Sequence, residues 1–234
     1  MSRVIVVTGA SRGIGRATAE LFAKRGDSVF TLSRSPCPVA GVTHLSTDFL
    51  HPDFADQAAA FFEANLHDKE KIVLIHNAAG MVKDTALTTD ASDLEDLLQL
   101  NVVAPTVLNK LLFQRMTPGS SILYVGSTLS EKAVAGTSSY VVSKHALAGL
   151  AKATCQDLIG TQIHSVCVCP GFTDTEMLRE HVGHDEGVLD FLGNMSAFGR
   201  LIQPQEIAET LAFCADHPVV NGAILHANLG QKES

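Results

Sequence analysis

Short apolar runs alternate with longer segments of helical spacing along almost the whole chain. The apolar runs are rich in β-branched residues and predict strands over residues 4–7, 28–32, 71–76, 121–125, 163–169 and 223–226. Apolar positions that recur every three to four residues predict helices over 14–24, 54–66, 93–113, 138–159 and 205–215. This alternation predicts a mostly parallel sheet with helices on both faces, and continuously apolar strands are typical of such a sheet.

No repeat, low-complexity tract or linker interrupts the alternation, so we expect a single domain over residues 1–234. Two stretches, 36–38 and 172–199, have the composition of loops. The second is long for a compact domain and contains several glycines, which is typical of a lid. We therefore expect a substrate lid at about 172–200.

Composition and charge narrow the function classes. Of 234 residues, 46% are hydrophobic and 18% are charged, which is enough apolar material for a sizeable core. The formal net charge of −8 argues against general binding to nucleic acid or to anionic membranes, because both need basic surface. No apolar run reaches about 18 residues and the start lacks a signal-peptide pattern, so we expect a cytoplasmic protein without a membrane span.

Cysteine and histidine usage predicts no metal site. The five cysteines have no CxxC spacing, which favours buried free thiols, with a metal or redox pair as the alternative. Cys167 and Cys169 are two apart in a predicted strand, so both thiols should share one face. His181 and His184 have no identifiable further ligands, so we interpret them as surface histidines.

The first predicted strand runs into a glycine-rich turn, Thr8-Gly9-Ala10-Ser11-Arg12-Gly13-Ile14-Gly15, and a helix follows. Glycines allow a tight turn and a close approach of the backbone to a phosphate, and the helix N-terminus offers free N–H groups to a pyrophosphate. A plain structural turn is the alternative. The position of the turn after the first strand favours a dinucleotide site in a doubly wound α/β sheet of the Rossmann type, with about seven strands.

Charge indicates which dinucleotide binds. A ribose with a free 2′-hydroxyl is usually held by an acidic residue about 20 positions further on, at the end of the second strand. Here that strand ends in Leu32-Ser33-Arg34, and Arg12 lies inside the glycine-rich turn. Two guanidinium groups suit a 2′-phosphate, so we expect NADP(H) to be preferred over NAD(H). Two solvated surface arginines are the alternative.

Six motifs resemble those of the short-chain dehydrogenase/reductase family, in the family's order and over nearly the whole chain. They are the turn at 8–15 (TGxxxGxG), Asn77-Ala78-Ala79-Gly80, Asn101 after Leu100, Ser127, Tyr140-x-x-x-Lys144 and Pro170-Gly171. The 13 residues from Ser127 to Tyr140 also match the family's spacing. Residues 227–230 read Ala-Asn-Leu-Gly, where the family often has Val-Asp-Gly-Gly. The resemblance implies a nicotinamide-dependent oxidoreductase.

The resemblance also implies roles for individual residues. Tyr140 would give its proton to a developing alkoxide and Ser127 would hydrogen-bond the substrate oxygen. Lys144 would hold the nicotinamide ribose, and Asn101 would hold a water that relays protons to Lys144. From the residues themselves, Tyr140 and Lys144 are four apart and share a helix face, and an adjacent ammonium favours phenolate.

The candidate cofactor contacts extend beyond the glycine-rich turn. Asp48, near the end of a third short strand, resembles the family's adenine-contacting Asp, and residues after Pro170 would contact the nicotinamide carboxamide. The full set of candidate cofactor-binding residues is Gly9, Ser11, Arg12, Gly13, Ile14, Gly15, Arg34, Asp48, Phe49, Asn77, Ala78, Ala79, Gly80, Tyr140, Lys144, Pro170, Gly171, Thr173 and Thr175.

The predicted activity is the reversible, NADPH-dependent reduction of a small ketone or aldehyde. A 3-oxoacyl-carrier-protein reductase is the first alternative, although the lid offers only Arg179 and Arg200 for docking an acidic carrier protein. An NAD-linked alcohol dehydrogenase and a catalytically silent NADPH-binding sensor or scaffold are the others. The intact set of Ser127, Tyr140 and Lys144 argues against the sensor.

Two further expectations concern surfaces. Apolar lid residues either adapt to apolar substrates or pack the lid on the body; they are Met177, Leu178, Phe191, Leu192, Met195 and Phe198. By resemblance we expect a homodimer or homotetramer, paired through the helices at 93–113 and 138–159. Leu147, Leu150 and Ala151 are expected to face away from the sheet, toward a partner.

Overall fold

The computed structural model describes residues 3–232 and confirms the predicted parallel α/β sheet. Its strand order is β3-β2-β1-β4-β5-β6-β7, and every neighbouring pair is parallel. The strands are β1 Val4–Thr8, β2 Ser28–Ser33, β3 Thr43–Ser46, β4 Ile72–His76, β5 Ser121–Val125, β6 His164–Pro170 and β7 Ile224–Ala227.

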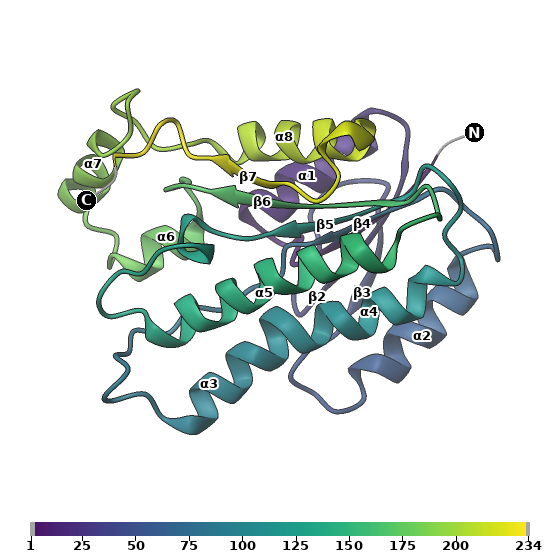
Figure 1. The fold of residues 1–234 in the computed structure, drawn as a ribbon, viewed down its shortest axis with the longest axis horizontal. Coiled ribbons are helices and arrows are strands. Elements are labelled where there is room, and N and C mark those ends of the chain that lie inside the picture. Colours follow the sequence, from purple (N-terminus) through teal and green to yellow (C-terminus); the bar gives the residue numbers. More distant parts are fainter. Residues whose placement is uncertain (1–2, 233–234) are drawn as a thin grey trace.

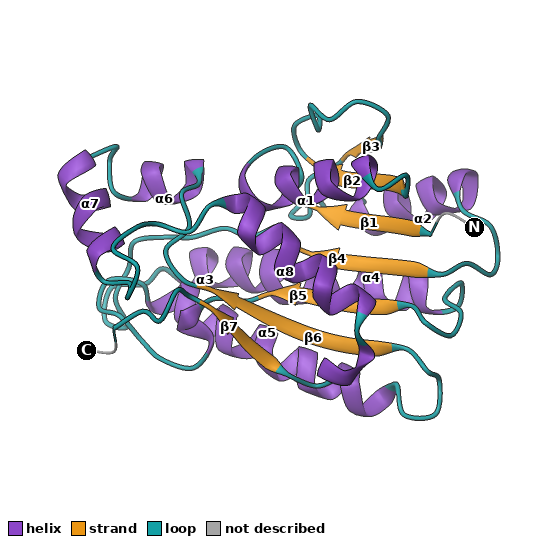
Figure 2. Cartoon of the chain, turned by 90° about the horizontal axis from the view of Figure 1, so that it is seen from above, coloured by secondary structure: helices purple, strands orange, loops and turns teal. Residues whose placement is uncertain are grey.

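Helices cover both faces of this sheet (Figures 1 and 2). They are α1 Gly13–Lys24, α2 Phe54–Asn65, α3 Ala91–Leu98, α4 Ala104–Phe113, α5 Ser138–Asp157, α6 Glu176–His181, α7 Glu186–Asn194 and α8 Pro204–Asp216. In Figure 1, α1 and α8 lie on one side of the sheet and α2, α4 and α5 on the other. No helix within residues 3–232 is long and apolar enough to span a membrane.

Strand burial explains why the apolar runs are continuous. All residues of β1, β4, β5 and β6 are buried, because both faces of these strands are covered. Alternate residues of these strands point to opposite faces of the sheet and pack into two separate cores. One core, beneath α2, α4 and α5, includes Phe62, Leu74 and Tyr124. The other, beneath α1 and α8, includes Phe22, Ile75 and Leu211.

Three details differ from the sequence predictions. The loop predicted over 172–199 contains α6 and α7. The helix predicted over 93–113 is a continuous helical run with a π-helical segment, η1 Gln99–Val103, between α3 and α4. Leu147 and Ala151 do not face a partner: they are buried in the core beneath α5, and Leu150 packs against that core. Because α5 contacts β5 and β6, its apolar residues pack against the sheet.

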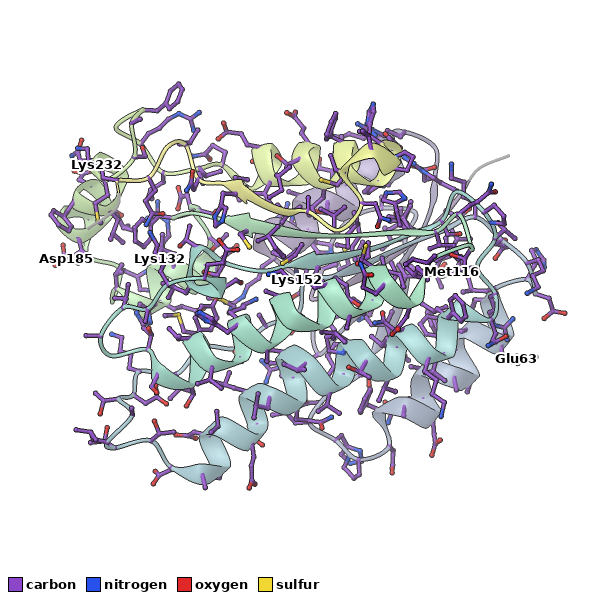
Figure 3. All side chains as sticks on the ribbon, in the orientation of Figure 1. Glu63, Met116, Lys132, Lys152, Asp185 and Lys232 are labelled. Carbon is purple, nitrogen blue, oxygen red and sulfur yellow. The ribbon has the colours of Figure 1, made fainter. Side chains whose placement is uncertain are left out.

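The topology determines where a ligand site can lie. The chain leaves β1 toward β2 and β3, then returns to the other side of β1 with β4, so strand order reverses there. In such sheets, ligands bind at the carboxyl ends of the strands beside this reversal. In Figure 3, Lys132, Asp185 and Lys232 lie at that end of the molecule, and Glu63 and Met116 lie at the opposite end.

Candidate active site

A cavity of about 910 Å³ opens at the carboxyl ends of the strands. Its walls come from the glycine-rich turn, the ends of β2, β4, β5 and β6, the start of α5, the segment 171–192 and Gln231. Nearly all sequence-predicted site residues line this cavity; the exceptions are Gly15 and Asn101. Residues from very different parts of the chain therefore meet where the fold predicts a ligand.

The glycine-rich turn is joined to the turn after β4 by partly buried hydrogen bonds. The Thr8 hydroxyl accepts the N–H groups of Asn77 and Ala78, both at 3.0 Å. The Asn77 carboxamide donates to the carbonyls of Thr8 (3.0 Å) and Gly9 (2.9 Å). Asn77 thus shapes the turn with its side chain. Thr8 was missing from the candidate residues, although it is the first residue of the TGxxxGxG motif.

Glycine is required at two positions of this turn. Gly9 has φ +67°, and a Cβ there would lie 2.7 Å from the Cα of Ala78. A Cβ on Gly15 would lie 2.3 Å from the carbonyl oxygen of Gly9. Gly15 therefore packs against the Gly9 carbonyl within the turn and does not line the cavity. Within residues 3–232, no side chain caps α1, so its first-turn N–H groups keep their capacity for a ligand. This cradle fits the pyrophosphate of a dinucleotide.

The two arginines predicted to hold a 2′-phosphate both line the cavity, but in different states. Arg34 is exposed and makes no ion pair with any residue of the described range 3–232. Arg12 precedes α1 and forms a two-pronged ion pair with Glu180 of α6. Nearby, the carboxylate of Asp48 accepts the N–H of Leu50 at 3.0 Å, which fixes the chain beside Phe49.

Ser127, Tyr140 and Lys144 lie around one part of the cavity. The Ser127 hydroxyl accepts the N–H of Leu129 at 3.1 Å, which leaves its hydrogen free to donate. Lys144 is only 2% exposed; its ammonium donates to the carbonyl of Val125 at 2.8 Å and lies 5.5 Å from the ring centroid of Tyr140. No group of residues 3–232 bonds to the Tyr140 hydroxyl, which borders the cavity.

Asn101 lies in the π-helical segment η1 and is buried away from the cavity wall. Its carboxamide donates to the Ser143 hydroxyl at 2.9 Å and accepts the N–H of Gly80 at 3.2 Å. Asn101 therefore connects the turn after β4 to α5, the helix that carries Tyr140 and Lys144. The relay of protons by a water on Asn101 stays a prediction.

The start of α5 is capped from a distant part of the chain. Asp84, which is buried, accepts the backbone N–H of Ser139 at 3.1 Å and also the Ser139 hydroxyl. The Thr89 hydroxyl donates to the same carboxylate at 3.0 Å. The Ser139 hydroxyl is the main reason that the pKa of Asp84 lies below its ordinary value. Asp84 was missed by sequence reasoning because the contact spans 55 residues.

The stretch after β6 forms another wall of the cavity. Pro170, Gly171, Thr173 and Thr175 all line it. The Thr173 hydroxyl donates to the carbonyl of Gly171 at 3.0 Å, and the Thr175 hydroxyl caps α6 by accepting the N–H of Leu178. A Cβ on Gly171 would lie 2.9 Å from the Oε1 of Gln231, so the C-terminal stretch packs directly on this turn.

Many of the residues that line the cavity are apolar. The apolar residues lining it include Met81, Leu129, Val134, Met177, Leu178, Val182, Val188 and Leu192. Phe191 and Phe198 do not join them and are 65% and 70% exposed. His181 also lines the cavity, and burial followed by the charge of Lys83 lowers its pKa. His181 is partly exposed and His184 is exposed.

The cysteines are free, as expected, and all but Cys37 are buried. The sulfur atoms of Cys167 and Cys169 are 3.8 Å apart on one face of β6, which confirms their predicted common orientation. The neighbouring Cys169 thiol and burial raise the pKa of Cys167. Within residues 3–232, no group of three or more His, Cys, Asp or Glu side chains is placed to hold a metal ion.

Comparisons with known proteins agree with this arrangement. A family model described as enoyl-(acyl carrier protein) reductase matches residues 9–232. Carbonyl reductase family member 4 of Xenopus laevis is 31% identical over 235 residues, 96% of each chain. The 3-oxoacyl-[acyl-carrier-protein] reductase FabG of Vibrio cholerae is 29% identical over 238 residues, 97% of this chain and 96% of FabG. The ligand-free aldohexose dehydrogenase of Thermoplasma acidophilum has a TM-score of 0.90 at 27% identity, covering 98% of this chain and 93% of that one.

The chain belongs to the short-chain dehydrogenase/reductase family, whose members are oxidoreductases that use a nicotinamide cofactor on alcohol or carbonyl groups. Two more distant structures share the fold with different cofactors. An L-sorbose reductase of Gluconobacter frateurii complexed with NADPH and L-sorbose has a TM-score of 0.88 at 22% identity. A 4-hydroxyisoleucine dehydrogenase complexed with NADH has a TM-score of 0.86 at 19% identity. The fold alone therefore does not choose between NADH and NADPH.

Proposed function

We propose that this protein is an NADPH-dependent reductase of an uncharged, largely apolar ketone or aldehyde, working reversibly. The observation that carries the proposal is the meeting of Ser127, Tyr140 and Lys144 at one cavity with the glycine-rich turn. The apolar residues of the cavity lining support a substrate without charge. In this proposal residues 1–234 form one domain, and α6 and α7 belong to a substrate lid over 172–200.

The cavity offers a place for each part of the cofactor. The glycine-rich turn and the start of α1 would hold the pyrophosphate, Asp48 and Phe49 the adenine, and Lys144 the nicotinamide ribose. The Pro170–Thr175 stretch would hold the carboxamide. A nicotinamide bound there would supply the hydride.

The protein's own residues would manage the proton. The Tyr140 hydroxyl, which has no partner within residues 3–232, would donate to the carbonyl oxygen as hydride arrives. The free hydrogen of Ser127 would bind the same oxygen, because the Leu129 N–H already occupies a lone pair of the hydroxyl. The Lys144 ammonium, 5.5 Å from the Tyr140 ring, would stabilise the phenolate left behind.

The preference for NADP(H) rests on Arg34 and Arg12. Arg34 is the better supported, because it lines the cavity without an ion-pair partner in the described range. Its guanidinium can bind a phosphate through two parallel hydrogen bonds. Within residues 3–232, the cavity lining includes one acidic residue close to the end of β3, Asp48, and its side chain already accepts a backbone N–H.

The direct test is oxidation of NADPH and of NADH, followed by absorbance, with a panel of carbonyl compounds. The panel contains simple aldehydes, vicinal diketones, quinones, cyclic ketones and acetoacetyl thioesters. We expect NADPH turnover, and Tyr140→Phe should lower kcat by a factor of about 100 to 10,000. The chain has one other tyrosine, Tyr124, buried between Asn109 and Thr154. Tyr124→Phe removes the same atom and should retain turnover.

The alternatives give other outcomes. NADH preference would contradict the two-arginine hypothesis and leave the oxidoreductase in place. Binding of NADPH without Tyr140-dependent turnover on any carbonyl would support a sensor or scaffold. The 3-oxoacyl-[acyl-carrier-protein] reductase alternative is favoured by the name of the FabG relative. It is disfavoured by Arg179 and Arg200, because both are paired within the chain, with Asp174 and Glu206 respectively. Turnover restricted to acetoacetyl thioesters would reverse this ranking.

A homodimer or homotetramer and a cytoplasmic location stay predictions. Apolar side chains that remain exposed along the long helices support a partner surface, and they include Val103, Phe113 and Val142. These residues replace Leu147, Leu150 and Ala151 as the candidate contacts.

A further inference from the structure

The arginine of the glycine-rich turn is already paired with a carboxylate of α6, a helix with other residues that line the cavity. Arg12 Nη2 donates to Glu180 Oε2 at 3.0 Å, and Arg12 Nη1 donates to Glu180 Oε1. The two residues are 168 positions apart, and Glu180 belongs to α6. This bond raises the pKa of Arg12 and lowers that of Glu180. The fork of N–H groups that could bind a phosphate is therefore bound to Glu180 in this state.

The contact involves more of α6 than one side chain. Glu176, one helical turn before Glu180, lines the cavity and adds to the negative charge facing Arg12. A Cβ on Gly13 would lie 3.2 Å from Thr175 Cγ2 and 3.7 Å from Glu176 Oε2. The start of α6 thus rests on the glycine-rich turn. A dinucleotide that binds at the start of α1 therefore meets the contact between α6 and the glycine-rich turn.

Carboxylate and phosphate compete for the same guanidinium fork. The side chains of Arg12 and Glu180 are 47% and 53% exposed, and exposed ion pairs are weak because water screens them. A phosphate monoester carries up to two charges near neutral pH, so it is a stronger partner than one carboxylate. A ribose with a free 2′-hydroxyl has no charge with which to compete.

We propose that Glu180 is a specificity-determining residue that occupies Arg12 until the 2′-phosphate of the cofactor displaces it. This inference rests on the proposed use of NADP(H). Displacement separates α6 from the glycine-rich turn, so a phosphate-bearing cofactor loosens the segment 172–200 and NAD(H) leaves it attached. Glu180 thereby reduces the affinity for NADP(H) and couples the choice of cofactor to the wall of the substrate cavity.

Binding of 2′,5′-ADP and of 5′-AMP to the full chain, measured by calorimetry, tests this proposal without requiring turnover. Glu180→Gln should tighten the binding of 2′,5′-ADP by a factor of about three to five and leave that of 5′-AMP unchanged. Glu186→Gln is the matched control, because Glu186 pairs with Arg179 in the same segment and does not line the cavity. In an Arg12→Gln background, Glu180→Gln should lose its effect, because the two changes act through one contact.

Each other outcome overturns the inference. Weaker binding of both nucleotides to Glu180→Gln would mean that Glu180 closes over a bound cofactor instead of competing with it. If Glu180→Gln still tightened the binding of 2′,5′-ADP in the Arg12→Gln background, Glu180 would act only as a general negative charge. If Glu180→Gln left the affinity for 2′,5′-ADP unchanged, Glu180 would have no role in cofactor choice. The wild-type chain separately tests the use of NADP(H): equal binding of 2′,5′-ADP and 5′-AMP would contradict that function. The Glu180→Gln comparison would still decide the role of Glu180.

Discussion

The glycine-rich turn and the segment 172–200 face each other across one cavity, but different forces hold them. The turn is fixed by hydrogen bonds of Thr8 and Asn77 to backbone groups, none of which titrates near neutral pH. The segment is held to the rest of the molecule by backbone hydrogen bonds, such as those from Asp174 to Ile202 and from Ala197 to Leu229, and at the surface by the ion pairs Arg12–Glu180 and Arg200–Glu206. Acid, salt and a charged ligand therefore act on these ion pairs and leave the hydrogen bonds of Thr8 and Asn77 unchanged.

Burial follows the same division. No residue of α6 is buried, and in α7 the buried residues are Leu189 and Gly193. By contrast, α1 buries Gly15, Ala17, Thr18, Ala19 and Phe22. Local opening costs least where few apolar side chains are buried. The molecule thus combines a tightly packed glycine-rich turn and α1 with a loosely packed wall formed by α6 and α7.

Gly15→Ala should lower the free energy of unfolding most, because it disrupts the tightly packed glycine-rich turn. The added Cβ would lie 2.3 Å from the Gly9 carbonyl oxygen and 2.4 Å from Asn77 Nδ2, and backbone cannot move aside cheaply. The free energy of unfolding, measured in urea, should fall by about 3 kcal/mol, and binding of 2′,5′-ADP should be lost. Gly149→Ala is the control: nothing lies within 4 Å of its Cβ, so stability should rise by up to about 1 kcal/mol. Equal stability of the two variants would contradict a tightly packed turn.

Asn77→Ala should cost less, because it removes hydrogen bonds without adding a clash. The carbonyls of Thr8 and Gly9 would lose their donor, and the free energy of unfolding should fall by about 2 kcal/mol. Asn65→Ala also removes an amide that donates to a carbonyl, that of Phe61, but at an exposed helix end. Its effect should stay within about 0.5 kcal/mol. If the Asn65 change proved as costly as the Asn77 change, the turn would not depend on these bonds.

The sequence predicted the elements of the tightly packed side well, and the physical reason is periodicity. The continuously buried strands and the helix before Lys24 gave strong patterns, and their ends were displaced by only one or two residues. The segment 172–200 gave no comparable pattern, because α6 has six residues and α7 nine. The signals that remained were the caps, Thr175 before α6 and Asp185 before α7.

The candidate site shows the same limit. Ser127, Tyr140, Lys144 and the glycine-rich turn meet because parallel strands bring their carboxyl ends to one edge, and that could be predicted. The pairs Arg12–Glu180 and Asp84–Ser139 could not, because a contact between distant side chains leaves no periodic signal. The face of α5 was misjudged for a related reason: apolar residues surround much of this helix, and only packing against β5 and β6 determines which side is buried.

Acid should produce the smallest effect, confined to the loosely packed side. Glu206 joins the end of the segment to α8, and its bonds to the Arg200 guanidinium, then to the Gln203 N–H, lower its pKa to about 2. Because the folded pKa lies below the unfolded value near 4.3, this stabilisation is complete above that pH and is lost as the pH falls toward 2. The Glu206 side chain is 37% exposed, so solvent screening limits its contribution to about 1 kcal/mol or less. Urea denaturation of wild type and Glu206→Gln should therefore differ by that amount at pH 6 and by about half as much at pH 3. A difference that is the same at both pH values would show that the ionised carboxylate does not hold this end of the segment.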